Sequence, residues 1–346
     1  MSNSNIMVFV DPSSAAYYSG RLFDVENTAL NRDGCLLPFY KLKTHLSGLG
    51  QETFTADYLF AAPADGRLKH YYSLGVLSNF KKMAGRKDVQ LKAFIVFEPP
   101  VVAPYLYAYL PELCRNFEKV YVHNTEGDGY SLRGVDQSKL RKLWWPQPYD
   151  DVRMEHWNNL ERSNRIVVVN GNHIPRRLSR QLYGKRIEAM AALASLGAVD
   201  LYGMGWRKWW SHRSMWPPYW FNYRTLMSIY QGPAASKYQT LSRYRFSLCF
   251  ENMSMKGYLT EKLFDCLYAG TVPIYLGAPD IADLVPEAAY IDARKYRRWS
   301  EMWEDVKDMP EQKWQDMREA GRAFLRSEQG MRYYNSLIEI FSLGEL

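Results

Sequence analysis

Short apolar runs alternate with longer amphipathic stretches along the first 120 residues. The runs have the length and composition of buried strands, and they lie at 6–11, 57–61, 93–97 and 119–123. Apolar residues at helical spacing occupy 68–84 and 103–117. Strands that alternate with helices predict a parallel sheet covered on both faces.

The alternation restarts after a break, KLWWPQPYDDV, which carries two prolines. Further strands are expected at 165–170, 199–203, 244–250, 271–277 and 288–292. Helices are expected at 185–197, at 258–270 and from about 311 to the end. The fold class is therefore α/β, with two units of similar size at 1–155 and 156–346, the second ending in helices. Ligands of such folds bind at the carboxyl ends of the strands, between the domains.

Composition narrows the class of protein without choosing its partner. Hydrophobic residues make up 47% of the 346 residues and charged residues 23%, which excludes disordered and fibrous classes. The net charge of +7 favours an anionic partner, such as nucleotide phosphates, nucleic acid or an acidic membrane face. No nucleic-acid recognition motif accompanies the basic residues, so nucleic acid is disfavoured.

Cysteine spacing and hydropathy bear on location. The four cysteines lie far apart without a CxxC pair, which argues against a zinc site or a disulfide framework and favours a reducing compartment. Neither a signal-peptide pattern nor an apolar run of about 18 residues occurs. We expect a cytoplasmic protein that is at most peripheral to a membrane.

The most informative segment is 246–279, where a strand, a loop and a helix follow one another. Lys262 falls in the first helical turn, where a cation is disfavoured by about 0.3–1 kcal/mol unless an anion binds there too. Free N–H groups and a lysine at that end form a phosphate site, and Glu261 can accept two hydrogen bonds from a ribose diol. A solvated Glu–Lys pair is the alternative interpretation.

A second helix opens on Lys185 and Arg186, and Arg186 can clamp a diphosphate bidentately. Basic residues often begin surface helices, so this helix start alone is weak evidence for a diphosphate site. Together with the helix start at Lys262 it strengthens the prediction of such a site. Neither a P-loop nor a dinucleotide GxGxxG fingerprint is present. Because Asp-x-Asp is also absent, we expect Arg, Lys and helix N-termini to neutralise a leaving diphosphate, with no metal cofactor.

In the N-terminal half, acidic residues follow two neighbouring strands. Glu98 ends the strand near 93–97, a sound place for a general base, although it could equally cap the following turn. The loop HNTEGDG follows the next strand and offers His123, Glu126 and Asp128 as a second-choice base or as acceptor contacts. Ordinary turn chemistry is the alternative for this loop.

Two further segments attract attention by composition. Five tryptophans lie between Trp206 and Trp220, where aromatic faces could stack on a sugar; packing onto their own domain is the alternative for most of them. The basic run 294–298 is usual for a solvated face and less usual for a membrane patch.

The strings FSLCFEN, GYLTEK and AGTVPIYLG within 246–277 resemble the inverting α-1,3/4-fucosyltransferases of glycosyltransferase family 10, bacterial branch. Weaker similarity covers FEPP near 97–100, KRIEAMAAL with VDLYGMGW, and WPQPY. The resemblance implies a GT-B fold, in which two Rossmann-like domains face each other across a cleft. The first domain would bind the acceptor and the second GDP-fucose.

The resemblance also implies roles for single residues. Glu98 matches the family's proposed catalytic base, although FEPP stands here in place of the commoner ESP. The positions that match the donor site are Arg186, Asn252, Tyr258, Glu261 and Lys262. GDP-β-L-fucose is the implied donor, and N-acetylglucosamine within a Gal–GlcNAc oligosaccharide is the implied acceptor.

Two departures from the family leave alternatives open. The C-terminal heptads and basic tail of some bacterial members are missing, so their membrane docking is not assumed, although peripheral contact through basic surface stays possible. The tryptophan-rich stretch has no matched counterpart, which leaves the acceptor open. Two other hypotheses stay open. The protein could be a transferase that uses another GDP-sugar or a lipid-linked acceptor, or it could bind a nucleotide-sugar or glycan without catalysis.

Overall fold

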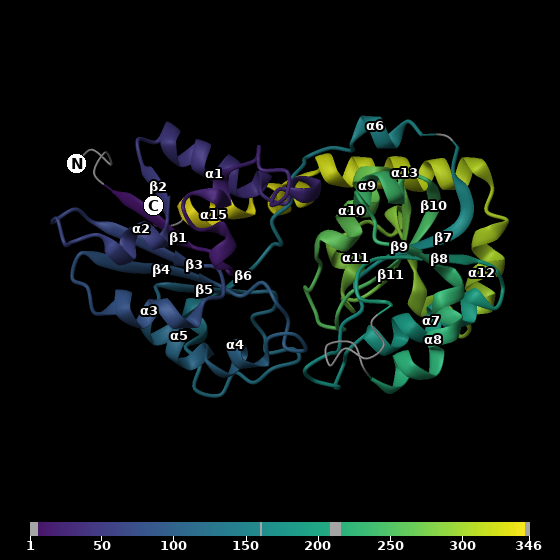
Figure 1. The fold of residues 1–346 in the computed structure, drawn as a ribbon, viewed down its shortest axis with the longest axis horizontal. Coiled ribbons are helices and arrows are strands. Elements are labelled where there is room, and N and C mark those ends of the chain that lie inside the picture. The colour runs from purple at the N-terminus through teal and green to yellow at the C-terminus, as the bar shows by residue number, and fades with distance from the viewer. Residues whose placement is uncertain (1–5, 160, 208–215, 343–346) are drawn as a thin grey trace. The chain divides into compact units, whose positions relative to one another are not determined.

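The computed structural model describes residues 6–159, 161–207 and 216–342. The chain forms two compact units, Met1–Pro148 with Arg332–Leu346, and Tyr149–Met331 (Figure 1). The sequence places the boundary at 155/156 and assigns all of the terminal helices to the second unit. In the structure the chain passes to the second unit seven residues earlier, and its last segment returns to the first.

The first unit is a parallel six-stranded sheet in the order β2-β1-β3-β4-β5-β6. Its strands are β1 (Met7–Asp11), β2 (Glu52–Thr55), β3 (Lys69–Ser73), β4 (Val89–Ile95), β5 (Lys119–Val122) and β6 (Leu140–Lys142). Its helices are α1 (Leu37–Gly48), α2 (Ala56–Ala61), α3 (Leu77–Ala84), α4 (Pro104–Ala108), α5 (Leu110–Asn116) and α15 (Ser336–Ser342).

Side chains of β1 alternate between two cores, one on each face of this sheet. Phe9 packs in the core that α3 and α5 cover, whereas Val8 and Val10 pack in the core that α1 and α15 cover (Figure 1). The period of two is that of a strand buried on both sides. The predicted sheet with two covered faces is thereby confirmed for this unit.

Two sequence predictions in the first unit are wrong. The run 57–61, predicted as a strand, is the helix α2, in which Ala56 and Leu59 are buried at helical spacing while Tyr58 and Phe60 are exposed. The stretch 68–84, predicted as one helix, contains β3 followed by α3. A short apolar run fits the spacing of a buried helix as well as that of a buried strand, so strand pairing decides between them. The segment β3 is a strand because it pairs with β1 on one side and β4 on the other, with all five residues buried.

The second unit is also a parallel six-stranded sheet, in the order β12-β11-β10-β7-β8-β9. Its strands are β7 (Ser163–Val169), β8 (Val199–Tyr202), β9 (Tyr230–Gly232), β10 (Tyr244–Phe250), β11 (Val272–Leu276) and β12 (Ile291–Asp292). Its helices are α6 (Met154–Trp157), α7 (Tyr183–Ala194), α8 (Pro217–Ile229), α9 (Lys237–Leu241), α10 (Glu261–Ala269), α11 (Ile281–Leu284), α12 (Trp299–Lys307) and α13 (Glu311–Arg326), while α14 (Glu328–Tyr334) crosses the boundary between the units.

The strand order of the second unit identifies where a ligand of this fold binds. Counted along the chain, its six strands lie in the order 6-5-4-1-2-3, the doubly wound Rossmann arrangement. The direction of winding reverses between β7 and β10, which are neighbours in the sheet. Ligands of open α/β sheets bind beyond the carboxyl ends of the strands at this switch point.

Candidate functional site

Arg186 joins the two strands of the switch point. It projects from the first turn of α7, and its Nη1 donates to Asn170 Oδ1, just after β7, at 2.9 Å. Its Nη2 donates to the carbonyl oxygens of Phe250 and Glu251, at the end of β10, at 2.5 and 3.1 Å. Arg186 is only 2% exposed, so its guanidinium holds the two strand ends together from inside the unit.

The site retains buried donors that lack a protein acceptor. Among the described residues, Arg186 Nε and Asn172 Nδ2 have no hydrogen-bond partner. Burial lowers the pKa of Arg186, against which nearby Tyr183 and Glu251 act to keep the guanidinium charged. Buried polar groups are normally satisfied, and a ligand with negatively charged oxygens would satisfy both of these.

Glu251 fixes the start of α10. Its buried carboxylate accepts from the Thr260 N–H at 2.8 Å and from the Thr260 hydroxyl at 2.8 and 3.0 Å. It also accepts from Lys262 Nζ at 3.1 Å. Lys262 therefore tolerates its position in the first helical turn because a buried carboxylate lies beside it.

Lys262 remains a cation within this arrangement. Its side chain is 17% exposed, and burial by itself would lower the pKa of the ammonium. The charges of Glu251 and Glu261 oppose that effect, so the net pKa of Lys262 is raised. The carboxylate of Glu261 lies 3.8 Å from Nζ, hence the solvated Glu–Lys pair anticipated from sequence is secondary to the buried pair with Glu251.

Glu261 presents an acceptor without a donor. Its Oε2 is buried and has no hydrogen-bond partner within the described part of the chain. Burial raises the pKa of this carboxyl, but the charges of Lys262 and Lys237 together with hydrogen bonds to the carboxylate lower it by more, so the net pKa is below the ordinary value. The group is an ionised acceptor suited to ligand hydroxyls.

The remaining sequence-predicted donor residues belong to the loop between β10 and α10. The Asn252 carbonyl accepts from the Leu182 N–H at 3.0 Å, which ties the loop to the start of α7. Tyr258 is buried, and its carbonyl accepts from the Tyr275 hydroxyl at 3.4 Å. The structure thus brings all five residues to one end of the second unit.

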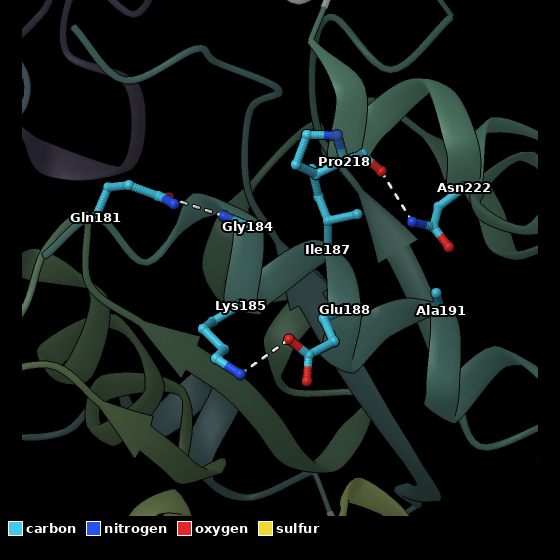
Figure 2. Close-up of a pocket in the computed structure, with 8 residues that line it drawn as sticks. All are labelled: Gln181, Gly184, Lys185, Ile187, Glu188, Ala191, Pro218 and Asn222. Atoms are coloured by element: carbon cyan, nitrogen blue, oxygen red, sulfur yellow. Dashed lines mark hydrogen bonds and ion pairs between the residues drawn. The ribbon is translucent and has the colours of Figure 1, made fainter. Parts of the chain in front are cut away.

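The basic pair at the start of α7 separates in the structure. Arg186 is buried, whereas Lys185 is exposed. Lys185 pairs with Glu188 at 3.0 Å (Figure 2). Lys185 borders a pocket of about 420 Å³ between α7 and α8, which is a different place from the switch point. The pocket is lined by Gln181, Gly184, Lys185, Ile187, Glu188, Ala191, Pro218 and Asn222.

Trp206 and Gly203 support Asn170, the side-chain partner of Arg186. The indole Nε1 of Trp206 donates to the Asn170 carbonyl at 2.7 Å. Gly203 has φ 139°, and a Cβ there would lie 1.9 Å from the same carbonyl oxygen, so only glycine allows the approach. Trp206 and Trp216 are buried in their own unit and Trp220 is exposed, whereas Trp209 and Trp210 lie outside the described residues.

In the first unit, Glu98 and His123 follow the neighbouring strands β4 and β5. Glu98 is exposed, and its charge adds to burial in raising the pKa of Tyr107. His123 is buried, with Nε2 2.6 Å from the Phe97 carbonyl and its ring stacked on Trp145 at 5.8 Å. The two side chains therefore belong to one end of the sheet.

The loop after His123 is built around Asn124. The backbone N–H groups of Glu126 and Asp128 both donate to Asn124 Oδ1, at 2.9 and 3.0 Å. The Tyr130 hydroxyl donates to the Asn124 carbonyl. The backbone here shows the turn chemistry that the sequence offered as the alternative, and it presents the Glu126 side chain to solvent.

Four residues of the second-unit site were not singled out from the sequence: Asn170, Asn172, His173 and Glu251. Asn170 and Glu251 directly follow β7 and β10, and Asn172 and His173 lie in the loop after β7. Their position could have identified them as site residues, since polar residues that follow two neighbouring parallel strands lie at the same edge of the sheet. Recognising it requires the strand order, which shows that these two strands are neighbours.

Two Rossmann-like units, with a charged cluster at the switch point of the second, define the GT-B class of glycosyltransferase folds. A crystal structure of an α1,3-fucosyltransferase superimposes with a TM-score of 0.51 at 13% identity, covering 92% of this chain and 82% of that one. The fold class expected from the sequence is thereby confirmed.

The sequence of the second unit matches a known family model. Residues 168–318 match the model described as glycosyltransferase family 10 (fucosyltransferase) C-term. The predicted resemblance is confirmed, and the matched range contains Arg186, Glu251, Glu261 and Lys262.

Curated relatives match over short segments. An α-(1,3)-fucosyltransferase of Helicobacter pylori is 35% identical over 72 residues, which is 21% of this chain and 15% of the relative. An α-(1,4)-fucosyltransferase of Arabidopsis thaliana is 43% identical over 67 residues, 19% of this chain and 17% of the relative. The matches thus span less than a fifth of the length of these two relatives.

Proposed function

We propose that the protein transfers L-fucose from GDP-β-L-fucose to a hydroxyl of N-acetylglucosamine in a LacNAc-type acceptor. Transfer inverts the anomeric centre and gives an α-1,3 or α-1,4 fucoside. One observation carries the proposal: within the segment that matches the family 10 model, Arg186 and Lys262 lie at the switch point of a Rossmann sheet, near enough for their charges to interact, and buried donors there have no acceptor.

The second unit is the proposed donor-binding unit. Glu261 accepts hydrogen bonds from the ribose hydroxyls through its unpartnered Oε2. Lys262, Arg186 Nε and the first-turn N–H groups of α10 face the diphosphate and neutralise the charge that grows as it leaves. Asn252 and Tyr258 shape the loop that precedes this helix.

The first unit is the proposed acceptor-binding unit, and Glu98 is its base. The acceptor oxygen forms a bond to C1 of fucose while the bond from C1 to the diphosphate oxygen breaks, and GDP departs with that electron pair. The hydroxyl proton passes to the Glu98 carboxylate. An exposed carboxylate at a strand end supports this role, and His123, Glu126 and Asp128 are the proposed acceptor contacts.

No metal takes part in the proposed reaction. Two cations, Arg186 and Lys262, serve the diphosphate, and each is held in place by carbonyl or carboxylate oxygens of its own unit. Electrostatic stabilisation by one such preorganised donor is worth about 10²–10³ in rate.

The direct test measures GDP release from GDP-fucose with GlcNAc, LacNAc, lactose and Gal-β1,3-GlcNAc as acceptors, with and without EDTA. We expect acceptor-dependent release with LacNAc-type sugars at a rate that EDTA leaves unchanged. GDP-mannose serves as the matched donor control and should give no transfer. Tight binding of GDP-fucose without release would contradict catalysis, and loss of activity in EDTA would contradict the metal-free mechanism.

We place the protein in the cytoplasm, in peripheral contact with an anionic membrane surface. All four cysteines are free thiols, as in reducing compartments. Among the described residues of 171–230, six basic side chains are exposed against one acidic side chain, Glu188. The basic residues are Arg176, Arg177, Arg180, Lys185, Arg207 and Arg224. On α8, Trp220 (45% exposed) and Phe221 (87% exposed) share a face with Arg224.

No helix among the described residues is both long and apolar enough to span a bilayer.

Cosedimentation with vesicles tests this contact. The protein should bind phosphatidylglycerol vesicles and not phosphatidylcholine vesicles, because the attraction is electrostatic. Phe221→Asp should weaken binding, whereas Phe60→Asp, at an exposed position of the first unit, should leave it unchanged. Equal binding to both vesicle types would refute the electrostatic contact.

A further inference from the structure

His173 occupies the switch point without being part of the predicted donor site. It lies in the short loop that follows β7, three residues after Asn170, which is bonded to Arg186. The adjoining Asn172 N–H donates to the Met204 carbonyl at 2.9 Å, which ties the loop to the residues after β8. The backbone before His173 is therefore held at two points.

Two cations act on the imidazole, one from each helix at the switch point. Partial desolvation lowers the pKa of His173 below its ordinary 6.5, and the charges of Arg186 on α7 and Lys262 on α10 lower it further. The side chain is nevertheless exposed, so a bound ligand can reach it. Two carboxylates face the same lysine: Glu251 accepts from Lys262 Nζ at 3.1 Å, and a Glu261 oxygen lies 3.8 Å from that atom. The charges of Arg186 and Lys262 nevertheless lower the pKa of His173.

The atoms next to His173 point to an anion as the missing partner. Asn172, only 5% exposed, holds its Nδ2 without an acceptor, and Arg186, 2% exposed, does the same with Nε. A negatively charged oxygen would satisfy both of these N–H groups, and the charges of Arg186 and Lys262 would attract it. An anion bound there would meet the imidazole as well.

Resting on the proposed function, we propose that His173 is a third ligand of the donor diphosphate and binds it as an imidazolium. A diphosphate offsets the two cations that disfavour protonation, so its binding draws a proton onto His173. The imidazolium then donates a charge-assisted hydrogen bond to a phosphate oxygen, which strengthens as the bond to C1 breaks and that group gains charge.

The sign of the pH dependence follows from this coupling. In the free protein the pKa of His173 lies below 6.5, and in the GDP complex we expect that pKa to be higher. GDP therefore binds more tightly as pH falls through the interval between the free and bound values. Guanosine, which lacks the diphosphate, shows no such dependence.

NMR titration of the histidine ring protons provides the first test, with the His173 signal identified by its loss in His173→Gln. We expect saturating GDP to raise the pKa of His173 by about one pH unit or more, and guanosine to leave it unchanged. The signal of His45, in the first unit, should not respond to either ligand. An unmoved His173 signal in the GDP complex would refute the inference.

Two variants separate the imidazole from its position. His173→Gln should weaken GDP binding about tenfold at pH 6 and remove the part of the pH dependence that does not come from the terminal phosphate of GDP, which itself titrates at about pH 6. His45→Gln should change neither. Gly171→Ala keeps the imidazole but displaces it, because a Cβ at 171 would lie 2.7 Å from His173 Nε2. Its φ lies outside the left-handed region, so alanine is accommodated, and we expect part of the same loss.

The outcomes distinguish this inference from the proposed function. If GDP binds the wild type with the same affinity at pH 6 and pH 8 while fucose is transferred, the role of His173 is wrong and the function stands. If GDP does not bind to the wild-type protein, both are wrong. Equal affinity of wild type, His173→Gln and Gly171→Ala for GDP would also exclude the histidine.

Discussion

Three glutamates of the two units differ in burial, and their proposed roles differ accordingly. Glu251 is fully buried, and its oxygens are occupied by Thr260 and Lys262, so it acts as a fixed counter-charge that positions the lysine. Glu261 keeps one unpartnered oxygen, as a ligand-binding acceptor would. Glu98 is exposed at a strand end, as a base that must meet an incoming hydroxyl would be.

Replacement of Glu98 by glutamine should remove the base and leave the nucleotide site intact. We expect Glu98→Gln to reduce kcat at least 10²-fold, the lower end of what general base catalysis contributes. The Kd for GDP should stay within twofold of wild type, because the donor residues lie in the other unit. Both quantities are measured by GDP release and by calorimetry.

A surface glutamate of the same unit provides the control for this variant. Glu118 is exposed and pairs with Lys92 at 2.6 Å, away from the proposed chemistry. Glu118→Gln should retain the wild-type kcat. Wild-type turnover in Glu98→Gln would eliminate Glu98 as the base.

At the scale of elements, α10 is defined by its two ends. Glu251 fixes its start, and Gly270 ends it at φ 70°, as the sequence predicted. A Cβ on Gly270 would lie 2.9 Å from Arg318 Nη2 and 3.0 Å from Trp157 Cε3. The glycine is therefore required by backbone conformation and by close packing together.

Alanine at this position should destabilise the second unit by two separable effects. In Gly270→Ala the free energy of unfolding should fall by about 1 kcal/mol or more because alanine disfavours the left-handed conformation. It should fall by about 1–3 kcal/mol more because the new Cβ displaces Arg318 and Trp157. Gly197→Ala isolates the first effect, because Gly197 has φ 65° with no atom within 4 Å of its Cβ position. Native-state hydrogen exchange of β7 and β10 measures both losses, and equal losses would show that packing at Gly270 contributes nothing.

Sequence periodicity located most of the strands, but it predicted no element at α1, β2, β6, α8, β9 or α12. It also failed where two periods fit the same residues. The strands β7, β8, β10 and β11 lie within a residue or two of their predicted ranges. In contrast, 57–61 became a helix and 69–73 a strand, because neighbours in the sheet decide between the periods for such short runs. At 288–292 the strand shortens to Ile291–Asp292.

At the scale of the whole molecule, the C-terminal helices divide between the units. The helix α13 packs on α10 through Phe324 and Phe264, whose ring centroids are 5.8 Å apart. The helix α15 instead completes a core of the first unit, where Phe341 stacks on Tyr72 of β3 at 3.8 Å. Each unit therefore depends for stability on a different part of the same terminal segment.

Two phenylalanine variants test this division. Phe341→Ala should destabilise the first unit by about 3–5 kcal/mol and leave the second unchanged, because the cavity opens only in the first core. Phe324→Ala should do the reverse. Hydrogen exchange of β1 and β3 reports the first unit, and exchange of β7 and β10 the second. Loss of protection in both units from either single variant would contradict the division.

Local pattern and side-chain chemistry are enough to predict the α/β class, the motifs within 246–277 and the chemical types of the site residues. Which of those residues come together depends on the three-dimensional fold. The order of the strands makes β7 and β10 neighbours, turns Arg186 inward and Lys185 outward, and brings His173 under the influence of Arg186 and Lys262. Pairing between strands far apart in the chain is a non-local choice, and no local pattern encodes it.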